Sequence, residues 1–438
     1  MRSNVFQISA PELWVCRRPQ GHKITSLDSC VPVNSPGQNV SAMSSKSDVL
    51  APSKLRILLA DGSLAQYPQG GGHWSVFLQY LFGLQALGHD IFWLERLVRS
   101  GNPALDRKLI RLFLKRFYHY GFGSRCALLL VDTESGDISL ESAEVHGASK
   151  CHVREAIRDA DLMWNLCCTF RPPFLNLFKY RALIDLDPGM LQIPALDCGY
   201  SLSDHETLLT IGSKIGDPDC PVPTAGRLWH RFMPFVYLPL WRALPDPGKE
   251  APFSSITQWT WDEYWLEERL LSFSKRHAYL QYLEMPQKTG RVFELAANIH
   301  PRDTTGDREL MLKMDWRLAN PNWVARSPAA YQNYIRQSRA EFCCPKPFYK
   351  QFNTGWVSDR SVAYLASGRP VLAEDTGFSD YLPTGHGLLC FNNSAEAAAG
   401  VAEIDRNYPV HMRAARELAE EYFNSEKWLP FMLSACGW

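Results

Sequence analysis

The stretch that decides the fold reads Gly355-Trp356-Val357-Ser358-Asp359-Arg360-Ser361-Val362-Ala363-Tyr364-Leu365-Ala366-Ser367-Gly368-Arg369-Pro370-Val371-Leu372-Ala373-Glu374-Asp375-Thr376-Gly377. It predicts a helix that Ser358 caps with its hydroxyl. Gly368 ends this helix in the left-handed conformation, and Pro370 prevents the helix from resuming. Residues 371–373 form a short apolar strand, and the polar run 374–377 follows at its carboxyl end. In open α/β sheets that end is where ligands bind.

A cation stands in the first turn of the predicted helix, where the helix dipole disfavours positive charge. This cation is Arg360. Either Asp359 and solvent offset the cost in an exposed ion pair, or Arg360 is there to bind an anion. An anion would also meet free backbone N–H groups at the helix start, as phosphates do in many proteins.

This stretch resembles the donor-nucleotide segment of GT-B glycosyltransferases, and the resemblance continues through residues 378–383 and 387–391. In that family the loop and the helix start hold the diphosphate of a nucleotide-sugar, and the polar loop after the strand meets the sugar. The resemblance therefore implies a diphosphate site at Ser358, Asp359, Arg360 and Ser361. It implies a donor-sugar site at Glu374, Asp375, Thr376 and Gly377.

The composition limits the classes of function. The chain has 438 residues, a length typical of two or three domains, and its formal net charge is zero. A nucleic-acid groove needs a basic excess, so we expect no nucleic-acid partner. The cysteines show no zinc-ligand spacing, and we expect no metal. Because no signal peptide and no apolar run of about 18 residues is evident, we predict a cytoplasmic protein without a membrane span.

The first half of the chain begins with a segment rich in Ser, Pro, Asn and Gly, so residues 1–53 are predicted to be a disordered extension. Residues 54–60 then read as a buried strand, 61–73 as a loop, 74–87 as an amphipathic helix and 89–95 as a second strand. This βαβ unit predicts a doubly wound, mostly parallel sheet.

The loop between these strands contains Gly70-Gly71-Gly72-His73, which has three interpretations. With Glu95 at the end of the second strand, it approximates a dinucleotide-binding fingerprint. It also resembles the Gly-Gly-His loop of GT-B enzymes, which faces the cleft between the domains. In that case His73 is the candidate general base, since an imidazole titrates near neutral pH. The third interpretation is a purely structural turn.

Acidic residues follow another predicted strand at residues 180–185. Asp185 and Asp187 alternate along the chain, so only one of them can face the cleft. Either one could hold an acceptor hydroxyl or act as a base, and we take Asp187 as the rival of His73. A capped turn with solvated carboxylates is the structural alternative.

The second half follows a proline-dense segment at residues 218–252, which we interpret as a rigid connection between domains. Strands at 255–261, 291–296, 316–318 and 341–344 alternate with helices at 266–283, 304–314 and 329–338. Lys346 lies just past the last of these strands, where a point charge suits a diphosphate; a solvated lysine is the alternative. A terminal helix at 411–423 and an apolar tail at 428–433 are expected to cross back to the first domain, as the resemblance implies.

Together these features predict an α/β protein with two Rossmann-like doubly wound domains facing a cleft, at residues 54–248 and 249–410, followed by a crossover segment at 411–438. By its resemblance to GT-B enzymes, the chain is expected to move a sugar from a UDP- or GDP-type nucleotide-sugar to an unknown acceptor, with no metal or other cofactor. Three alternatives stay open. These are a nucleotide-sugar epimerase or hydrolase on the same fold, an NAD(P)-dependent oxidoreductase, and a non-catalytic binding protein.

Overall fold

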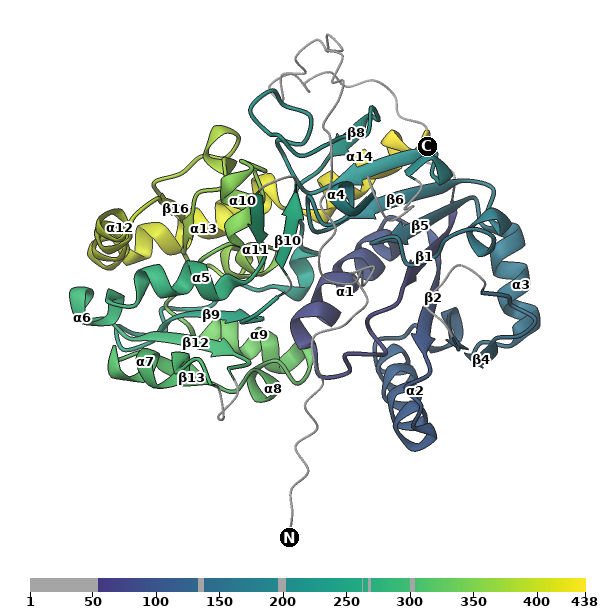
Figure 1. Ribbon diagram of the computed structural model, residues 1–438, viewed down its shortest axis with the longest axis horizontal. Coiled ribbons are helices and arrows are strands. Elements are labelled where there is room, and N and C mark those ends of the chain that lie inside the picture. The colour runs from purple at the N-terminus through teal and green to yellow at the C-terminus, as the bar shows by residue number, and fades with distance from the viewer. Residues whose placement is uncertain (1–53, 133–137, 196–201, 262, 267–268, 300–303) are drawn as a thin grey trace.

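The computed structural model describes residues 54–132, 138–195, 202–261, 263–266, 269–299 and 304–438. The extension predicted for residues 1–53 lies outside these ranges. The described residues form two lobes that lie side by side (Figure 1), each built on its own sheet. None of the helices within the described ranges is long and apolar enough to span a membrane.

The first lobe contains an eight-stranded sheet in the order β4-β3-β2-β1-β5-β6-β7-β8. β4 pairs antiparallel with β3, and the other pairs are parallel. The strands are β1 Arg56–Asp61, β2 Asp90–Val98, β3 Cys126–Val131, β4 Glu144–Gly147, β5 Leu162–Leu166, β6 Arg181–Asp185, β7 Thr207–Thr210 and β8 Trp229–Arg231. Its helices are α1 Gly71–Ala86, α2 Pro103–His119, α3 Lys150–Asp159 and α4 Gln192–Ala195.

The second lobe contains a six-stranded parallel sheet in the order β13-β12-β9-β14-β15-β16. Its strands are β9 Phe253–Thr257, β12 Phe293–Ala297, β13 Arg317–Ala319, β14 Ala340–Cys343, β15 Val371–Glu374 and β16 Leu388–Phe391. The helices after β9 are α5 Lys275–Tyr279, α6 Met285–Thr289, α7 Asp307–Lys313, α8 Pro321–Val324, α9 Pro328–Gln337, α10 Pro347–Gln351, α11 Asp359–Ala366, α12 Ser394–Arg406, α13 Tyr408–Tyr422 and α14 Ser425–Ala435.

Both sheets reverse their strand order beside their first strand, between β1 and β5 in one lobe and between β9 and β14 in the other. At such a switch point the loops leaving the two neighbouring strands turn to opposite faces of the sheet and leave a crevice at the carboxyl ends. His73 and Lys346 lie in the segments that follow β1 and β14, two of the strands at these switch points, whereas Asp187 follows β6 and Asp375 follows β15.

The helix predicted over residues 266–283 is wrong in its first part. Strands β10 Glu263–Leu266 and β11 Arg269–Ser272 form an antiparallel hairpin there, and helix begins only at Lys275 in α5. The sequence Tyr264-Trp265-Leu266 explains the difference, because aromatic residues favour strands. The proline-dense segment contains a further strand that the sequence did not reveal, β8, at the edge of the first sheet.

The predicted apolar tail is helical and forms most of α14. Leu429, Met432 and Leu433 recur on one face of this helix and are buried in the core of the first lobe. Leu429 packs so closely that a Cβ added at Gly83 of α1 would lie 2.4 Å from its side chain. The chain thus crosses from the second lobe and ends on the first, as the yellow helix in Figure 1 shows.

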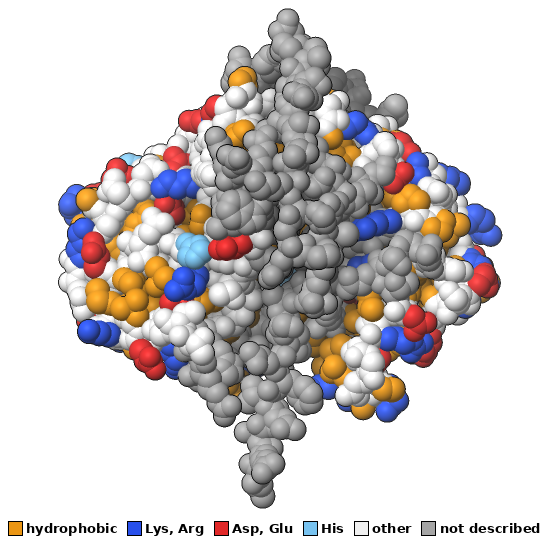
Figure 2. Space-filling view, in the orientation of Figure 1, with side chains coloured by type: hydrophobic (Ala, Val, Ile, Leu, Met, Phe, Trp, Pro, Cys, Tyr) orange, Lys and Arg blue, Asp and Glu red, His pale blue; other side chains and the backbone are white. Residues whose placement is uncertain are grey.

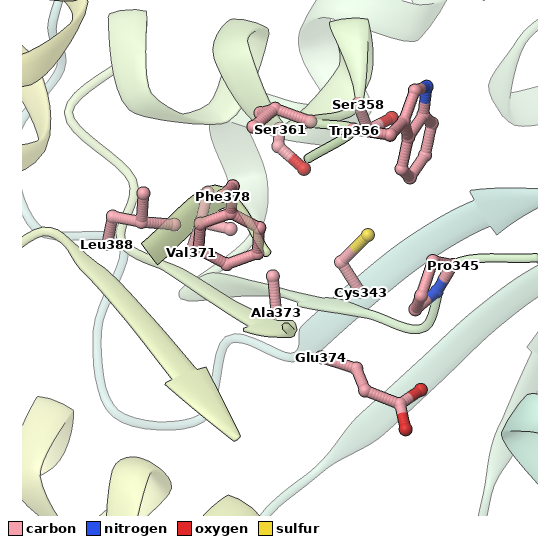
Figure 3. A pocket seen from close by; sticks show the side chains of 11 residues that line it. Cys343, Pro345, Trp356, Ser358, Ser361, Val371, Ala373, Glu374, Phe378 and Leu388 are labelled. Atoms are coloured by element: carbon pink, nitrogen blue, oxygen red, sulfur yellow. The ribbon is translucent and has the colours of Figure 1, made fainter. Parts of the chain in front are cut away.

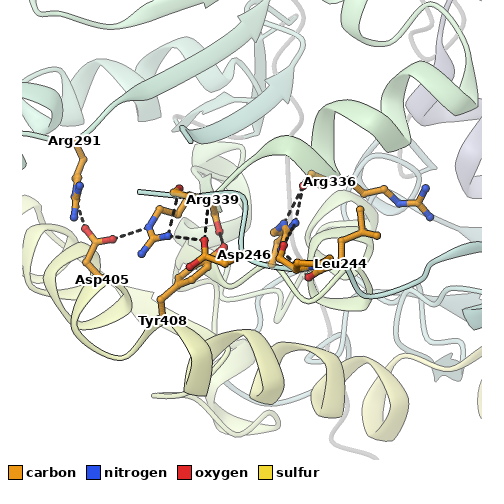
Figure 4. Close-up of polar contacts among 10 residues, drawn as sticks. Leu244, Asp246, Arg291, Arg336, Arg339, Asp405 and Tyr408 are labelled. Atoms are coloured by element: carbon orange, nitrogen blue, oxygen red, sulfur yellow. Dashed lines mark hydrogen bonds and ion pairs between the residues drawn. The ribbon is translucent and has the colours of Figure 1, made fainter. Parts of the chain in front are cut away.

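The segment that connects the lobes is held against the second one by two buried arginines (Figure 4). Arg339 donates to Oδ1 of Asp405 at 2.7 Å and contacts Asp246 at 3.3 Å. Arg369 donates to the carbonyl of Pro245 at 2.9 Å. These contacts hold residues 245 and 246 of the connecting segment against the second lobe.

Side chains of both charge signs are interspersed on the face seen in Figure 2, outside the grey region. This distribution agrees with the formal net charge of zero.

Candidate functional site

His73 lies in the first turn of α1, not in a loop. The sequence predicted a glycine loop through His73, but the helix begins at Gly71, Gly72 is helical, and Gly70 occupies the N-cap position. Glycine costs helix stability, so the reason for this glycine run lies in what the helix start touches.

The glycines allow α1 to touch the second lobe. The backbone N–H of Gly71 donates to the carbonyl oxygen of Ala325 at 2.6 Å. A Cβ at Gly71 would lie 2.3 Å from the carbonyl oxygen of Ser327, and a Cβ at Gly72 would lie 2.9 Å from the ring of Tyr331. Larger residues would force the lobes apart, so this part of the motif is an interlobe contact.

Glu95 does not have the environment of a ribose ligand. Its side chain is fully buried, with Oε1 accepting from the backbone N–H of Ala65 at 2.8 Å and Oε2 accepting from Nε1 of Trp93 at 2.9 Å. Burial raises the pKa of Glu95 well above its ordinary value, and the nearby Asp61 adds to the effect. Both carboxyl oxygens of Glu95 are therefore engaged in hydrogen bonds within the protein. This weighs against Glu95 binding the ribose of a nicotinamide cofactor in the first lobe.

The imidazole of His73 belongs to a chain of polar contacts at the end of β1. Nε2 of His73 contacts the hydroxyl of Ser63, and this hydroxyl contacts Oδ2 of Asp61. Oδ2 of Asp61 also accepts from the backbone N–H of Ser63 at 3.0 Å. Burial lowers the pKa of His73 below its ordinary value, while the charges of Asp61 and Asp187 oppose this. The lowered pKa favours the neutral imidazole, the form that can accept a proton.

Asp187 joins the two halves of the site. Its Oδ1 lies 2.8 Å from Nζ of Lys346 and also accepts from the phenol hydroxyl of Tyr349. Lys346 follows β14 in the second lobe, whereas Asp187 follows β6 in the first. Lys346, which the sequence predicted to bind the diphosphate, and Asp187, the predicted alternative to His73 as the base, are therefore in direct contact across the interface.

Asp185 and Asp187 have different side-chain partners, and Oδ1 of Asp185 accepts from the backbone N–H of Asp187 at 3.1 Å. Oδ2 of Asp185 accepts from Nε2 of Gln192 at 2.8 Å and from the hydroxyl of Thr210 at 2.7 Å. Burial raises the pKa of Asp185 to about 6. This residue holds the end of the first sheet together, and Asp187 is the one that reaches the interface.

Arg360 forms neither the exposed ion pair nor the open anion site that the sequence left as alternatives. Its Nε pairs with the fully buried carboxylate of Glu341 in β14. Nη1 donates to the carbonyl of Ile256 at 2.7 Å, and Nη2 lies 3.3 Å from Sγ of Cys343. The guanidinium therefore ties α11 to the second sheet, and its cost at the helix start is offset by a buried carboxylate that the sequence did not identify.

Ser358 caps α11 as predicted, accepting from the backbone N–H of Arg360 at 3.2 Å. Its hydroxyl and that of Ser361 line a small pocket between α11 and the second sheet (Figure 3). The other residues that line this pocket are Cys343, Pro345, Trp356, Val357, Val371, Ala373, Glu374, Phe378 and Leu388. Because most of these side chains are apolar, the two serine hydroxyls at the start of α11 line an otherwise apolar pocket.

Asp359 occupies the first position of α11 and is half-buried. Burial raises its pKa to about 7, and the negative charge of Asp187 acts in the same direction. A carboxyl group with this pKa carries a proton for part of the time at neutral pH. Asp359 therefore adds less negative charge to the start of α11 than its residue type implies.

The four residues proposed to read the donor sugar all have contacts within the protein. Oε1 of Glu374 accepts from Lys350 at 2.7 Å, and its carboxylate points away from the pocket in Figure 3. The side chain of Asp375 accepts from the backbone N–H of Gly377 at 2.9 Å, and the hydroxyl of Thr376 donates to the carbonyl of Trp356 at 2.7 Å. These contacts shape the loop, and sugar recognition by its side chains stays a prediction.

Lys275, at the start of α5, is a residue that the sequence analysis missed. Its Nζ lies 5.3 Å from the ring centroid of Trp356 and has no hydrogen-bond partner among the described residues. Burial lowers the pKa of Lys275 to about 8, and the positive charges of Arg360 and Lys346 act in the same direction. Lys275 forms no ion pair with the residues that the structure describes, although Glu341 lies close enough to oppose the shift, and an ammonium group near two other cations is suited to a polyanionic ligand.

No protein-family model matches the chain, and no curated protein matches it either. Solved structures do match. One is an alpha-glucosyltransferase in complex with UDP and a 13-mer DNA containing a central A:G mismatch, with a TM-score of 0.55, 9% identity, and coverage of 88% of this chain and 99% of the other. Another is Anabaena HepE in complex with UDP, with a TM-score of 0.51, 11% identity, and coverage of 86% and 99%.

At 9% and 11% sequence identity, these matches are evidence for the fold alone. The predicted fold class, two Rossmann-like domains in the GT-B arrangement, is thereby confirmed over most of the chain.

Proposed function

We propose that this protein is a glycosyltransferase that moves a sugar from a UDP-type nucleotide-sugar to an acceptor bound in the first lobe. The observation that carries the proposal is the interlobe contact of Lys346 with Asp187, with Lys275, which forms no ion pair with the described residues, close by. A cation of the second lobe thus meets an acid of the first lobe at the carboxyl ends of both sheets, and His73 lies at the same end of the first sheet. The choice of UDP is supported by the neighbours solved with UDP.

In this proposal Lys275 and Lys346 bind the donor diphosphate, and the positive end of α11 adds to the field. Arg360 contributes indirectly, because its pairing with Glu341 fixes the position of α11. The lysines stabilise the negative charge that develops as the bond between the sugar and the diphosphate breaks. On this basis we propose that the reaction needs no metal ion.

His73 is proposed as the general base of an inverting transfer, with Asp187 as its rival. As the acceptor oxygen attacks the anomeric carbon, the bond from that carbon to the diphosphate oxygen breaks. The acceptor proton passes to the neutral imidazole, and the nucleoside diphosphate leaves with both electrons of the broken bond. The lowered pKa of His73, which favours the neutral imidazole, supports this role.

The test measures release of UDP from UDP-glucose, with water as the acceptor, in His73→Gln, His73→Ala and Asp187→Asn. Loss of turnover by about 100-fold or more in the His73 variants, with UDP affinity intact, supports the base role. Near-normal turnover in both His73 variants removes His73 from the mechanism. If Asp187→Asn alone abolishes turnover, the base is Asp187.

The remaining alternatives are separated by the products. An epimerase returns an altered nucleotide-sugar, and a hydrolase releases free sugar even when acceptors are present. A binding protein gives no product while its affinity for UDP stays measurable.

A further inference from the structure

We infer that Ser63 and Asp61 are positioning residues that hold His73 in one tautomer and leave Nδ1 as the proton-accepting atom. The inference rests on the base role proposed for His73 and adds the residues that would set it. It follows from three contacts at the carboxyl end of β1.

The hydroxyl of Ser63 donates its hydrogen bond to Asp61. A carboxylate has no proton to donate, and Oδ2 of Asp61 already accepts from the backbone N–H of Ser63 at 3.0 Å. The hydroxyl of Ser63 contacts this same Oδ2, so its single proton is directed to Asp61. The oxygen of Ser63 then has only lone pairs to offer to His73.

The second step fixes the imidazole. Nε2 of His73 contacts the hydroxyl oxygen of Ser63, and because that oxygen can only accept, Nε2 must carry the hydrogen. A neutral imidazole has one N–H, so Nδ1 is unprotonated. Nδ1 has no hydrogen-bond partner among the described residues, and His73 is half-buried. The free lone pair is therefore at Nδ1.

The third step is the rigidity of the chain of contacts. The exposed fraction is 1% for Asp61 and 4% for Ser63, so water does not compete for their hydrogen bonds. The ring of His73 is also held edge-on against Phe77, with the two centroids 5.0 Å apart. Among the described residues, Asp61 and Asp187 are the charged groups that act on the imidazole. When Nδ1 takes a proton, Asp61 offsets the new charge through Ser63.

The first experiment uses the unmodified full chain. Nitrogen NMR of protein labelled in its histidines, assigned by comparison with His73→Gln, reports which ring nitrogen carries the hydrogen. The inference predicts hydrogen on Nε2 at pH 8. Hydrogen on Nδ1 overturns it, whatever the variants do.

The second experiment compares Ser63→Ala, Ser63→Thr and Asp61→Asn, with release of UDP from UDP-glucose as the readout. Ser63→Ala should lower turnover by at least about tenfold, as expected for loss of an orienting partner, and Ser63→Thr should restore it because it keeps the hydroxyl. Asp61→Asn should move the acidic limb of the pH profile to lower pH, since the imidazolium loses a favourable charge.

The two proposals fail in different ways. If His73→Gln keeps full turnover, the base role in the proposed function is wrong. If His73→Gln loses turnover while Ser63→Ala and Asp61→Asn keep both the turnover and the pH profile, the base role stands and the positioning role is overturned.

Discussion

Nζ of Lys346 lies 2.8 Å from Oδ1 of Asp187, although the two residues belong to different lobes. The same Oδ1 of Asp187 also accepts from the phenol hydroxyl of Tyr349, and Nζ of Lys346 lies 5.4 Å from the centroid of the Tyr349 ring. Binding of a nucleotide-sugar would replace the Asp187 carboxylate with phosphate oxygens and free Asp187 to face the acceptor. We therefore propose that this pair couples donor binding to the arrangement of the acceptor side.

The first prediction concerns the two lysines. Lys275→Ala and Lys346→Ala should each weaken UDP binding by about 1.5–3 kcal/mol, the range for charged hydrogen bonds, which corresponds to a loss of roughly 10- to 150-fold. Calorimetric titration with UDP measures this. Lys115→Ala, an exposed lysine on α2, is the matched control and should bind UDP normally. Unchanged affinity for UDP in both Lys275→Ala and Lys346→Ala would show that these two lysines do not bind the diphosphate.

The second prediction separates Arg360 from nucleotide binding. Arg360→Ala leaves the carboxylate of Glu341 buried without its partner, so the free energy of unfolding should fall by about 3–5 kcal/mol. The double variant Arg360→Met with Glu341→Leu should lose less than the single variant, because no buried charge is left. Urea unfolding measures both. A stable Arg360→Ala protein with greatly weakened UDP binding would instead restore the direct diphosphate role.

The third prediction follows from Asp359. Because burial raises its pKa to about 7, the folded protein binds this proton more tightly than the unfolded chain does. The stability linked to this group is present below the ordinary Asp pKa and is lost as the pH rises toward 7. Asp359→Asn should therefore be more stable than the original protein at pH 8 and gain little at pH 4. Thermal unfolding at the two pH values measures this, and an equal effect at both would contradict the raised pKa.

The fourth prediction concerns the interlobe glycine. Gly71→Ala places a methyl group against the backbone of Ser327, so the melting temperature should fall and UDP affinity should weaken as the lobes separate. Gly62→Ala is the control, because its nearest neighbours would be 3.4 Å away, an ordinary van der Waals distance. If Gly71→Ala matches the control in both measurements, the glycine run has another purpose.

The fold was largely predictable because buried parallel strands such as β1, β3 and β5 appear in the sequence as apolar runs bounded by turns. The cap at Ser358 and the division of roles between Asp185 and Asp187 also followed from local rules. The carboxylate that pairs with Arg360 was not predictable, because Glu341 lies on another strand and looks like any acidic residue. Lys275 was missed because the expected helix over 266–283 placed it mid-helix, whereas it begins α5 beside the interface.

The measurement that tests the central claim most directly is protection of the full chain from heat by UDP, GDP and NAD. A ligand that binds the folded state raises the melting temperature by mass action. A ligand concentration of 100 times the dissociation constant stabilises the folded state by about 2.7 kcal/mol. UDP should raise the melting temperature, NAD should not, and the effect of UDP should shrink in Lys346→Ala. Protection by NAD with none by UDP or GDP would contradict the central claim.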